Sequence, residues 1–204
     1  MAAHLHRGDL PAGMSFPNGV AVDTETMGLR LRRDPLCVVQ LSAGDGDAHI
    51  VQLQRDSYDA PNLKALLADP AIEKIFHFAR FDLGMIRLHL GVDCRPVYCT
   101  KIASRLVRTY TDRHGLKDLT KEVLGHDLKK EQQSSDWGAA DLTEAQLAYA
   151  ASDVLHLHDL RAKLDKMLER EGRKELARAC FDFLPTRAAL DLAGWSEEDI
   201  FAHA

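Results

Sequence analysis

The segment Gly19-Val20-Ala21-Val22-Asp23-Thr24-Glu25-Thr26 joins a short apolar run to two acidic residues. The turn residues Pro17-Asn18-Gly19 precede it, and its small and β-branched side chains predict a strand that ends near Asp23. Residues two apart in a strand point to the same side of the sheet. Asp23 and Glu25 can therefore direct two carboxylates at one point, at a strand end, where open α/β sheets place their sites.

Two more strands follow, over 36–41 and 48–53, separated by the turn Gly44-Asp45-Gly46-Asp47. Such short connections favour an antiparallel meander of these three strands. The pattern then changes, and we expect helices over 62–67 and 81–90 and strands over 73–77 and 96–99. Later helices are expected over about 100–109, 116–124, 143–169 and 173–181. This order predicts an α/β fold with a mixed five-stranded sheet flanked by helices.

The 204 residues are 46% hydrophobic and 28% charged, which is typical of a single globular domain. No apolar run approaches the roughly 20 residues that a membrane helix needs, and the N-terminus has no apolar signal core. The four cysteines form no CxxC pair, which favours reduced thiols in the cytoplasm. We therefore expect one cytoplasmic domain over 1–204. Its aromatic-rich segment, about 181–204, either packs on that domain or forms an interface between subunits.

The formal net charge of -5 argues against strong binding to long nucleic acid, which usually needs a basic surface. The charge is uneven, however, because residues 101–130 carry eight basic and four acidic side chains. This basic segment is either a solvated helix face or a surface that attracts phosphate. Its cations are Lys101, Arg105, Arg108, Arg113, Lys117, Lys121, Lys129 and Lys130.

Two further acidic residues complete a set of four carboxylates. Asp82 lies at the start of the helix after the fourth strand, and Asp153 lies four residues after Tyr149, on the same helix face. Phosphodiester hydrolysis can use two Mg²⁺ or Mn²⁺ ions about 4 Å apart. Hard cations prefer oxygen ligands, so such a site is built from carboxylates, and four of them would balance two divalent ions.

Three segments together resemble the motifs of the DEDD exonucleases: Asp23-Thr24-Glu25-Thr26, Phe76-His77-Phe78-Ala79-Arg80-Phe81-Asp82 and Tyr149-Ala150-Ala151-Ser152-Asp153. The third is similar to the tyrosine branch, because Ala148 stands where the other branch has a histidine. Gln133-Ser134-Ser135-Asp136-Trp137 resembles the segment before this motif in ribonuclease D. The resemblance covers about residues 18–170 and implies a ribonuclease H-like (DnaQ-like) exonuclease fold.

The resemblance implies a metal-dependent 3′–5′ exonuclease in which Asp23, Glu25, Asp82 and Asp153 are catalytic and hold two Mg²⁺ or Mn²⁺ ions. Tyr149 would orient the attacking water, since the ordinary tyrosine pKa, near 10, disfavours a role as its base. Gly138-Ala139-Ala140-Asp141 departs from the Arg-Pro-Leu sequence usual in ribonuclease D. Because the sequence stops at residue 204, we expect no C-terminal RNA-binding domain.

A short chain that opens with Leu5-His6-Arg7-Gly8-Asp9-Leu10-Pro11 is similar to the nanoRNase C family. That likeness implies a ring-shaped homo-oligomer that hydrolyses dinucleotides and very short oligoribonucleotides to mononucleotides. A general exonuclease that trims longer RNA or DNA is the alternative within the enzyme class. A nucleic-acid-binding module without activity is a further alternative, and the five intact motif positions disfavour it.

The side chains expected to contact substrate are Thr24, Thr26, Met27, Leu29, His77, Gln133, Ser135 and Trp137. Leu29 would separate the two bases of a dinucleotide, as the matching leucine does in short-oligonucleotide nucleases, or would pack in the core. His77 is either a substrate contact or a structural histidine. Trp137 belongs either to the core or to the mouth of the site.

Overall fold

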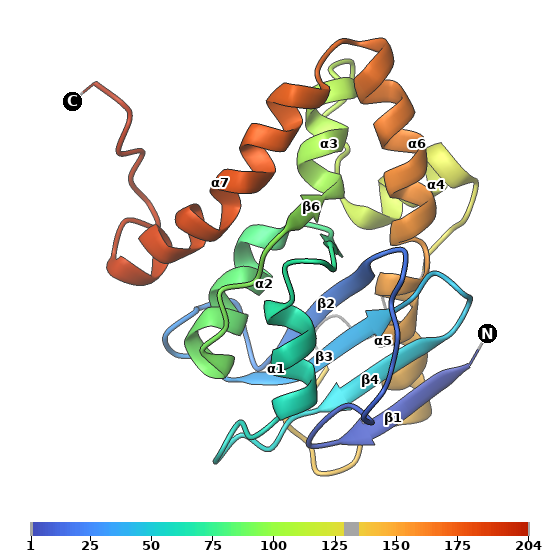
Figure 1. Ribbon diagram of the computed structural model, residues 1–204, viewed down its shortest axis with the longest axis vertical. Coiled ribbons are helices and arrows are strands. Elements are labelled where there is room, and N and C mark those ends of the chain that lie inside the picture. The colour runs from blue at the N-terminus through green and yellow to red at the C-terminus, as the bar shows by residue number, and fades with distance from the viewer. Residues whose placement is uncertain (1, 129–134, 204) are drawn as a thin grey trace.

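A computed structural model describes residues 2–128 and 135–203 of the chain. Its centre is a six-stranded sheet in the order β1-β4-β3-β2-β5-β6 (Figure 1). The strands are β1 (Ala3–Arg7), β2 (Val20–Thr26), β3 (Leu36–Ser42), β4 (Ala48–Gln52), β5 (Lys74–Phe76) and β6 (Val97–Cys99). The predicted antiparallel meander of β2, β3 and β4 is confirmed, and β5 and β6 add parallel strands on the side of β2.

The prediction of five strands is wrong by one, because β1 was not expected. This strand pairs in parallel with β4 at the edge of the sheet, with His4 opposite His49. Its five side chains are exposed or half-buried and include three polar ones. An edge strand of this kind lacks the apolar alternation from which strands are predicted.

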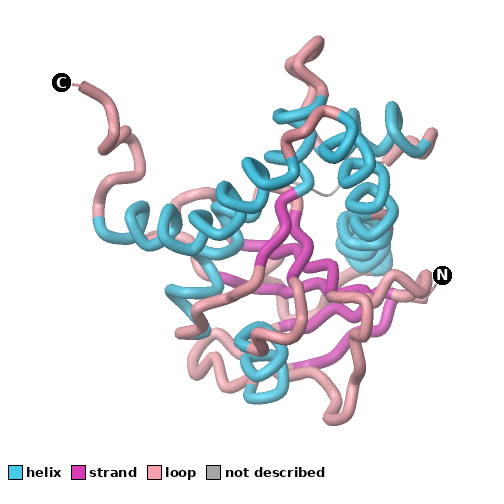
Figure 2. Tube along the Cα trace, turned by 45° about the horizontal axis from the view of Figure 1, so that its top comes forward, coloured by secondary structure: helices cyan, strands magenta, loops and turns pink. Residues whose placement is uncertain are grey.

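The helices are α1 (Pro61–Ala68), α2 (Ala79–Met85), α3 (Thr100–Val107), α4 (Leu116–Leu124), α5 (Glu144–Leu155), α6 (Leu157–Arg170) and α7 (Lys174–Ala193), with a short π-helix, η1 (Ile86–Leu90), after α2. In the view of Figure 1, α5 lies behind the sheet and α1 and α2 lie in front of it. Figure 2 shows the strands as one layer between helices, with the C-terminal segment extending away from it.

Two expectations about the helices are corrected. The helix predicted over 143–169 is divided at His156 into α5 and α6, and the helix predicted over 173–181 continues to Ala193. About half of the expected C-terminal tail is therefore helical. No helix in the described ranges is both long and apolar enough to cross a membrane.

The start of α5 is fixed by a capping box, which sets the helix that carries two of the predicted site residues. The Thr143 side chain accepts a hydrogen bond from the Gln146 backbone, and the Gln146 side chain accepts one from the Thr143 backbone. An apolar cluster that includes Val38, Ile50 and Ala150 packs α5 against the sheet. This packing holds α5 against the sheet with Tyr149 and Asp153 on the side of the helix that faces β2.

Candidate active site

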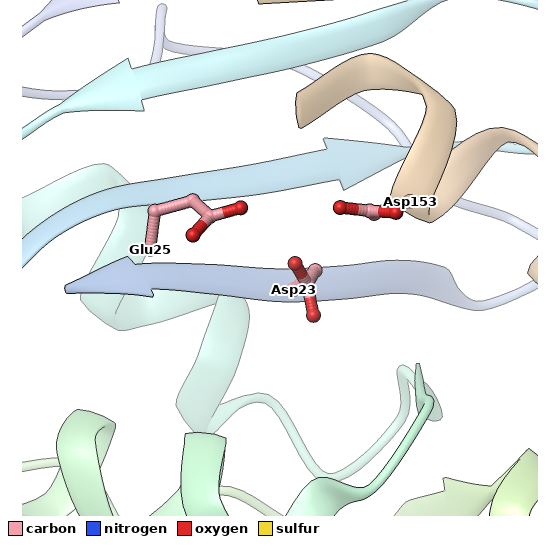
Figure 3. A group of neighbouring side chains, drawn as sticks. All are labelled: Asp23, Glu25 and Asp153. Carbon is pink, nitrogen blue, oxygen red and sulfur yellow. The ribbon is translucent and has the colours of Figure 1, made fainter. Parts of the chain in front are cut away.

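Three of the predicted carboxylates lie together beside β2 (Figure 3). One oxygen from each of Asp23, Glu25 and Asp153 lies within 4.8 Å of the other two. Asp23 and Glu25 come from β2, as their spacing predicts, and Asp153 comes from α5 on the adjacent layer. Side chains about 130 residues apart in the sequence thus form one acidic cluster.

Asp82 lies on α2, outside this group of three, and lines the same cleft. Its Oδ1 accepts a hydrogen bond of 2.5 Å from the hydroxyl of Thr24, which stands between Asp23 and Glu25 on β2. Thr24, expected to contact substrate, therefore uses its hydroxyl to tie Asp82 to the strand that carries the other acids.

Burial raises the pKa of all four carboxyls. The pKa of Glu25 rises to about 9, because burial and the charges of Asp153 and Asp82 both disfavour ionisation. Burial raises the pKa of Asp82 and of Asp153 to about 7, and the Asp23 pKa lies well above its ordinary range through burial and its acidic neighbours.

No lysine or arginine among residues 2–128 and 135–203 forms an ion pair with any of these four carboxylates. Asp82 is buried and the other three acids are half-buried, so their charges repel one another and ionisation of all four together is disfavoured. Divalent cations with a preference for oxygen ligands would relieve this repulsion. The residues present therefore fit a site for such ions.

Tyr149 lies one helical turn before Asp153 and also lines the cleft. Burial, the neighbouring acids and the hydrogen bond between its hydroxyl and Asp153 all raise the pKa of Tyr149 above its ordinary value. A tyrosine that keeps its proton can orient a water molecule but cannot deprotonate it. The hydrogen bond to Asp153 places this hydroxyl at the acidic cluster, and the orienting role expected from the sequence remains a prediction.

The cleft around the acids has a volume of about 610 Å³ and an apolar rim. Met27, Leu29 and Phe78 line it with 45%, 83% and 46% of their surface exposed. Leu29 is therefore not a core residue. Phe78 was missed in the sequence analysis, although it stands next to His77 in the second motif, and its φ of 70° is unusual for a residue with a side chain.

Within the described part of the basic segment, Lys101 and Lys117 line this cleft. The Lys101 ammonium lies 4.1 Å from the centre of the Phe78 ring. Arg108 has a different role, since it is fully buried and bonds Glu122 and Ser104. Lys129 and Lys130 lie outside the described residues.

The other residues expected to contact substrate differ in their surroundings and in their hydrogen bonds. His77 and Ser135 line the cleft. The Nδ1 atom of His77 lies 2.8 Å from the Thr100 hydroxyl oxygen, and burial lowers the pKa of His77 to about 3, so the ring is neutral. Thr26 also lines the cleft, and its hydroxyl donates to the Gly28 carbonyl at 2.5 Å.

Trp137 is not among the described residues that line the cleft. Trp137 is buried in the apolar cluster beneath α5, where its ring centre lies 6.1 Å from that of Tyr149. Trp137 therefore packs near Tyr149 from the apolar cluster and not from the cleft. Gln133 lies outside the described residues.

Comparison with known proteins places these features in a family. A family model described as 3′–5′ exonuclease matches residues 12–169. The ribonucleases D of Acidiphilium cryptum and Granulibacter bethesdensis are each 38% identical over 154 residues, which is 76% of this chain. The chain spans only about two fifths of the length of these curated relatives, 39% and 38% respectively.

Similar solved structures cover the whole chain. Brucella melitensis NrnC is 56% identical, with a TM-score of 0.97 and full coverage of both chains. The same protein solved with bound Mg²⁺ and bound to pGG is 54% and 55% identical, each with a TM-score of 0.95 and full coverage of both chains. These likenesses confirm the ribonuclease H-like exonuclease fold. The chain therefore belongs to the 3′–5′ exonuclease family, within its ribonuclease D-like branch.

Proposed function

We propose that this chain is a two-metal 3′–5′ exoribonuclease that hydrolyses dinucleotides and very short oligoribonucleotides to mononucleotides. The observation that carries the proposal is the group of four carboxylates that line a cleft with an exposed apolar rim and have no cationic partner among the described residues. Similarity over the full length of a protein solved with pGG supports a short substrate.

Asp23, Glu25 and Asp153, with Asp82 beside them, would hold the two Mg²⁺ or Mn²⁺ ions. When bound, the ions stabilise charge on the attacking and leaving oxygens of a phosphodiester. The protein's own part is to hold the acids in place through β2, α5 and the bond from Thr24 to Asp82.

Tyr149 would position the attacking water, because its hydroxyl stays protonated beside Asp153. A fixed hydroxyl limits the orientations that the water can adopt and so lowers the entropic part of the barrier. Among the described residues, Lys101 would attract the phosphate of the substrate, together with Lys117, which also pairs with Asp127 at 3.5 Å.

The apolar rim would hold the bases. Leu29 and Met27 line the cleft from the segment after β2, and Phe78, which is half exposed, lines it from the segment before α2. Stacking on an aromatic ring contributes roughly 1–3 kcal/mol per base and depends little on base identity. A substrate with only two bases can therefore bind through this rim without a long basic surface.

The test is the rate of cleavage of a 5′-labelled dinucleotide and a labelled heptamer, with Mg²⁺, with Mn²⁺ and with EDTA. We expect higher kcat/KM for the dinucleotide and no turnover in EDTA. Leu29→Ala should lower dinucleotide cleavage about 10-fold or more, with a smaller effect on the heptamer. Leu88→Ala, at an exposed leucine of η1 outside the cleft, is the matched control.

Equal kcat/KM for the two lengths in the unmodified enzyme would reject the dinucleotide preference and support general trimming of RNA or DNA. Binding of both oligonucleotides without cleavage, in the presence of either metal, would instead support a binding module.

We further propose that the protein acts as a cytoplasmic homo-oligomer, arranged as a ring. The residues after α7 support this, since Trp195, Ile200 and Phe201 are exposed there although they are large and apolar. Exposed apolar side chains grouped in this way are typical of protein interfaces. The four cysteines are free, as expected in a reducing compartment.

A further inference from the structure

The helix that carries Asp82 depends on outside contacts for its position. α2 begins after the left-handed residue Phe78, has no side-chain cap at its N-terminus, runs directly into η1 and packs in the core through Leu83 and Met85. Short helices such as these do not persist alone in water. The location of the Asp82 carboxylate is therefore set by what holds α2 against the rest of the protein.

Two polar contacts hold α2 from different sides. Successive residues of an α-helix are about 100° apart, so Arg80 and Asp82 point in nearly opposite directions. Asp82 accepts the hydrogen bond from Thr24 of β2. Arg80 forms a two-pronged ion pair with Asp191 of α7, with nitrogen–oxygen distances of 2.6 and 2.8 Å. Such forked pairs fix orientation as well as distance.

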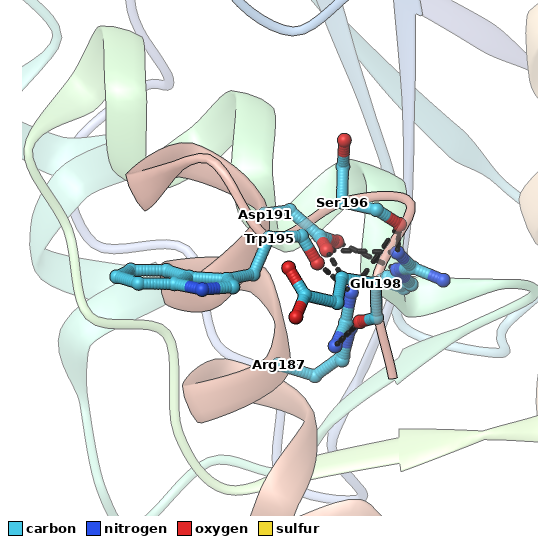
Figure 4. Close-up of polar contacts among 6 residues, drawn as sticks. Arg187, Asp191, Trp195, Ser196 and Glu198 are labelled. Carbon is cyan, nitrogen blue, oxygen red and sulfur yellow. Dashed lines mark hydrogen bonds and ion pairs between the residues drawn. The ribbon is translucent and has the colours of Figure 1, made fainter. Parts of the chain in front are cut away.

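Asp191 is the centre of a network at the end of α7 (Figure 4). Its side chain is only 4% exposed and also accepts a hydrogen bond of 2.7 Å from Arg187. The two guanidinium groups then donate to backbone carbonyls beyond the helix, Arg80 to Ser196 at 2.8 Å and Arg187 to Trp195 at 2.5 Å. The network therefore joins α2, α7 and the C-terminal segment.

The same end of α7 also reaches the other wall of the cleft. Arg32, in the segment that connects β2 to β3, donates through Nε to the Leu192 carbonyl at 3.1 Å. That segment carries Met27 and Leu29. Both walls are thus attached to one turn of α7, between residues 191 and 192.

We propose that Arg80 is a positioning residue for the active site. The ion pair of Arg80 with Asp191 fixes the position of α2, and therefore of Asp82, relative to β2. The C-terminal end of α7 thereby stabilises the cleft through contacts that lie outside it. Arg80 contacts none of the four clustered carboxylates and does not line the cleft. The inference rests on the proposed function in taking Asp82 as a metal ligand.

The test measures Mn²⁺ binding to the full chain without substrate, from the electron paramagnetic resonance signal of the free ion. We expect Arg80→Gln to weaken Mn²⁺ binding about 10-fold, as loss of outer partners of a metal site typically does. Arg187→Gln is the matched control, since it also removes a partner of Asp191 but lies on α7. Its Mn²⁺ affinity should stay within about threefold of the unmodified protein.

A double variant tests the route through Asp191. If Arg80 acts through that carboxylate, Arg80→Gln combined with Asp191→Asn should bind Mn²⁺ no more weakly than Asp191→Asn alone. Thermal unfolding of every variant separates a general loss of stability from a loss of affinity. If Arg80→Gln does not fold, Arg80→Lys takes its place in the test, because lysine keeps the positive charge but lacks the planar guanidinium group.

Unchanged Mn²⁺ affinity in Arg80→Gln, together with a lower melting temperature, would overturn the proposal and leave the ion pair a stabilising contact only. An equal loss of affinity in Arg187→Gln would overturn the assignment to Arg80. No Mn²⁺ binding by the unmodified protein would reject the metal site itself, and this inference with it.

Discussion

Removal of divalent metal should make the stability of this protein fall as the pH rises. In the metal-free protein the pKa of Glu25 is raised from 4.5 to about 9, and those of Asp82 and Asp153 are raised from 3.8 to about 7. Between the ordinary and the raised value, the folded state binds more protons than the unfolded state. The unfolding free energy is therefore highest near pH 4 and decreases through the neutral range.

The magnitude follows from the same values. Each pH unit between the two pKa values costs about 1.4 kcal/mol per group, so Glu25 alone would account for about 4 kcal/mol between pH 5.5 and 8.5. Relaxation of the structure and entry of water reduce this cost, and we expect a loss of at least about 2 kcal/mol. For a chain of this length that corresponds to a fall in Tm of about 4–8 °C.

Urea denaturation followed by circular dichroism, at pH 5.5, 7 and 8.5, measures this loss in EDTA and in Mg²⁺. Protein concentration is held constant because association also affects apparent stability. Mg²⁺ should remove most of the pH dependence, and Glu25→Gln should reduce it in EDTA. Glu169→Gln, at an exposed residue of α6, should leave the pH dependence of stability in EDTA unchanged. A stability that is flat or rises with pH in EDTA would refute the electrostatic account of the site.

Three other outcomes are expected. Tyr149→Phe should lower kcat by about 10²–10⁴-fold while Mn²⁺ affinity is largely kept, and an unchanged kcat at saturating substrate would remove Tyr149 from the mechanism. Asp82→Asn and Asp153→Asn should each abolish dinucleotide cleavage while the circular dichroism spectrum is retained; activity comparable to that of the unmodified enzyme would show that the carboxylate is dispensable. The unmodified protein should have a light-scattering mass that is a multiple of 22.7 kDa at micromolar concentration, and Trp195→Ser with Phe201→Ser should reduce it; a monomeric mass before substitution would contradict the oligomer.

Local rules predicted the two pairs of the cluster, and the resemblance to the three exonuclease motifs predicted that these pairs and Asp82 come together. Asp23 and Glu25 are two residues apart in a strand, and Tyr149 and Asp153 are four apart in a helix, so each pair shares a side whatever the rest of the fold. The meander of β2, β3 and β4 was predictable for a similar reason, since short turns leave little choice of pairing.

The features that were missed depend on contacts distant in sequence. β1 pairs with β4 across more than 40 residues and shows little apolar pattern of its own. The division between α5 and α6 at His156 does not interrupt the helical periodicity from which one helix was expected. Phe78 is an apolar side chain that a sequence pattern assigns to the core, whereas the structure exposes it at the cleft.

The three elements that build the acidic cluster are not held equally firmly. β2 is paired with a strand on each side, and α5 has a capping box and an apolar cluster beneath it. α2 also packs in the core, through Ala79, Leu83 and Met85, but it has no side-chain cap. Its polar attachments are single side chains, Thr24 on one side and Arg80 on the other. We expect variation in metal affinity to arise mainly from the contacts of α2, including those made by residues at the end of α7 that lie far from the acids in sequence.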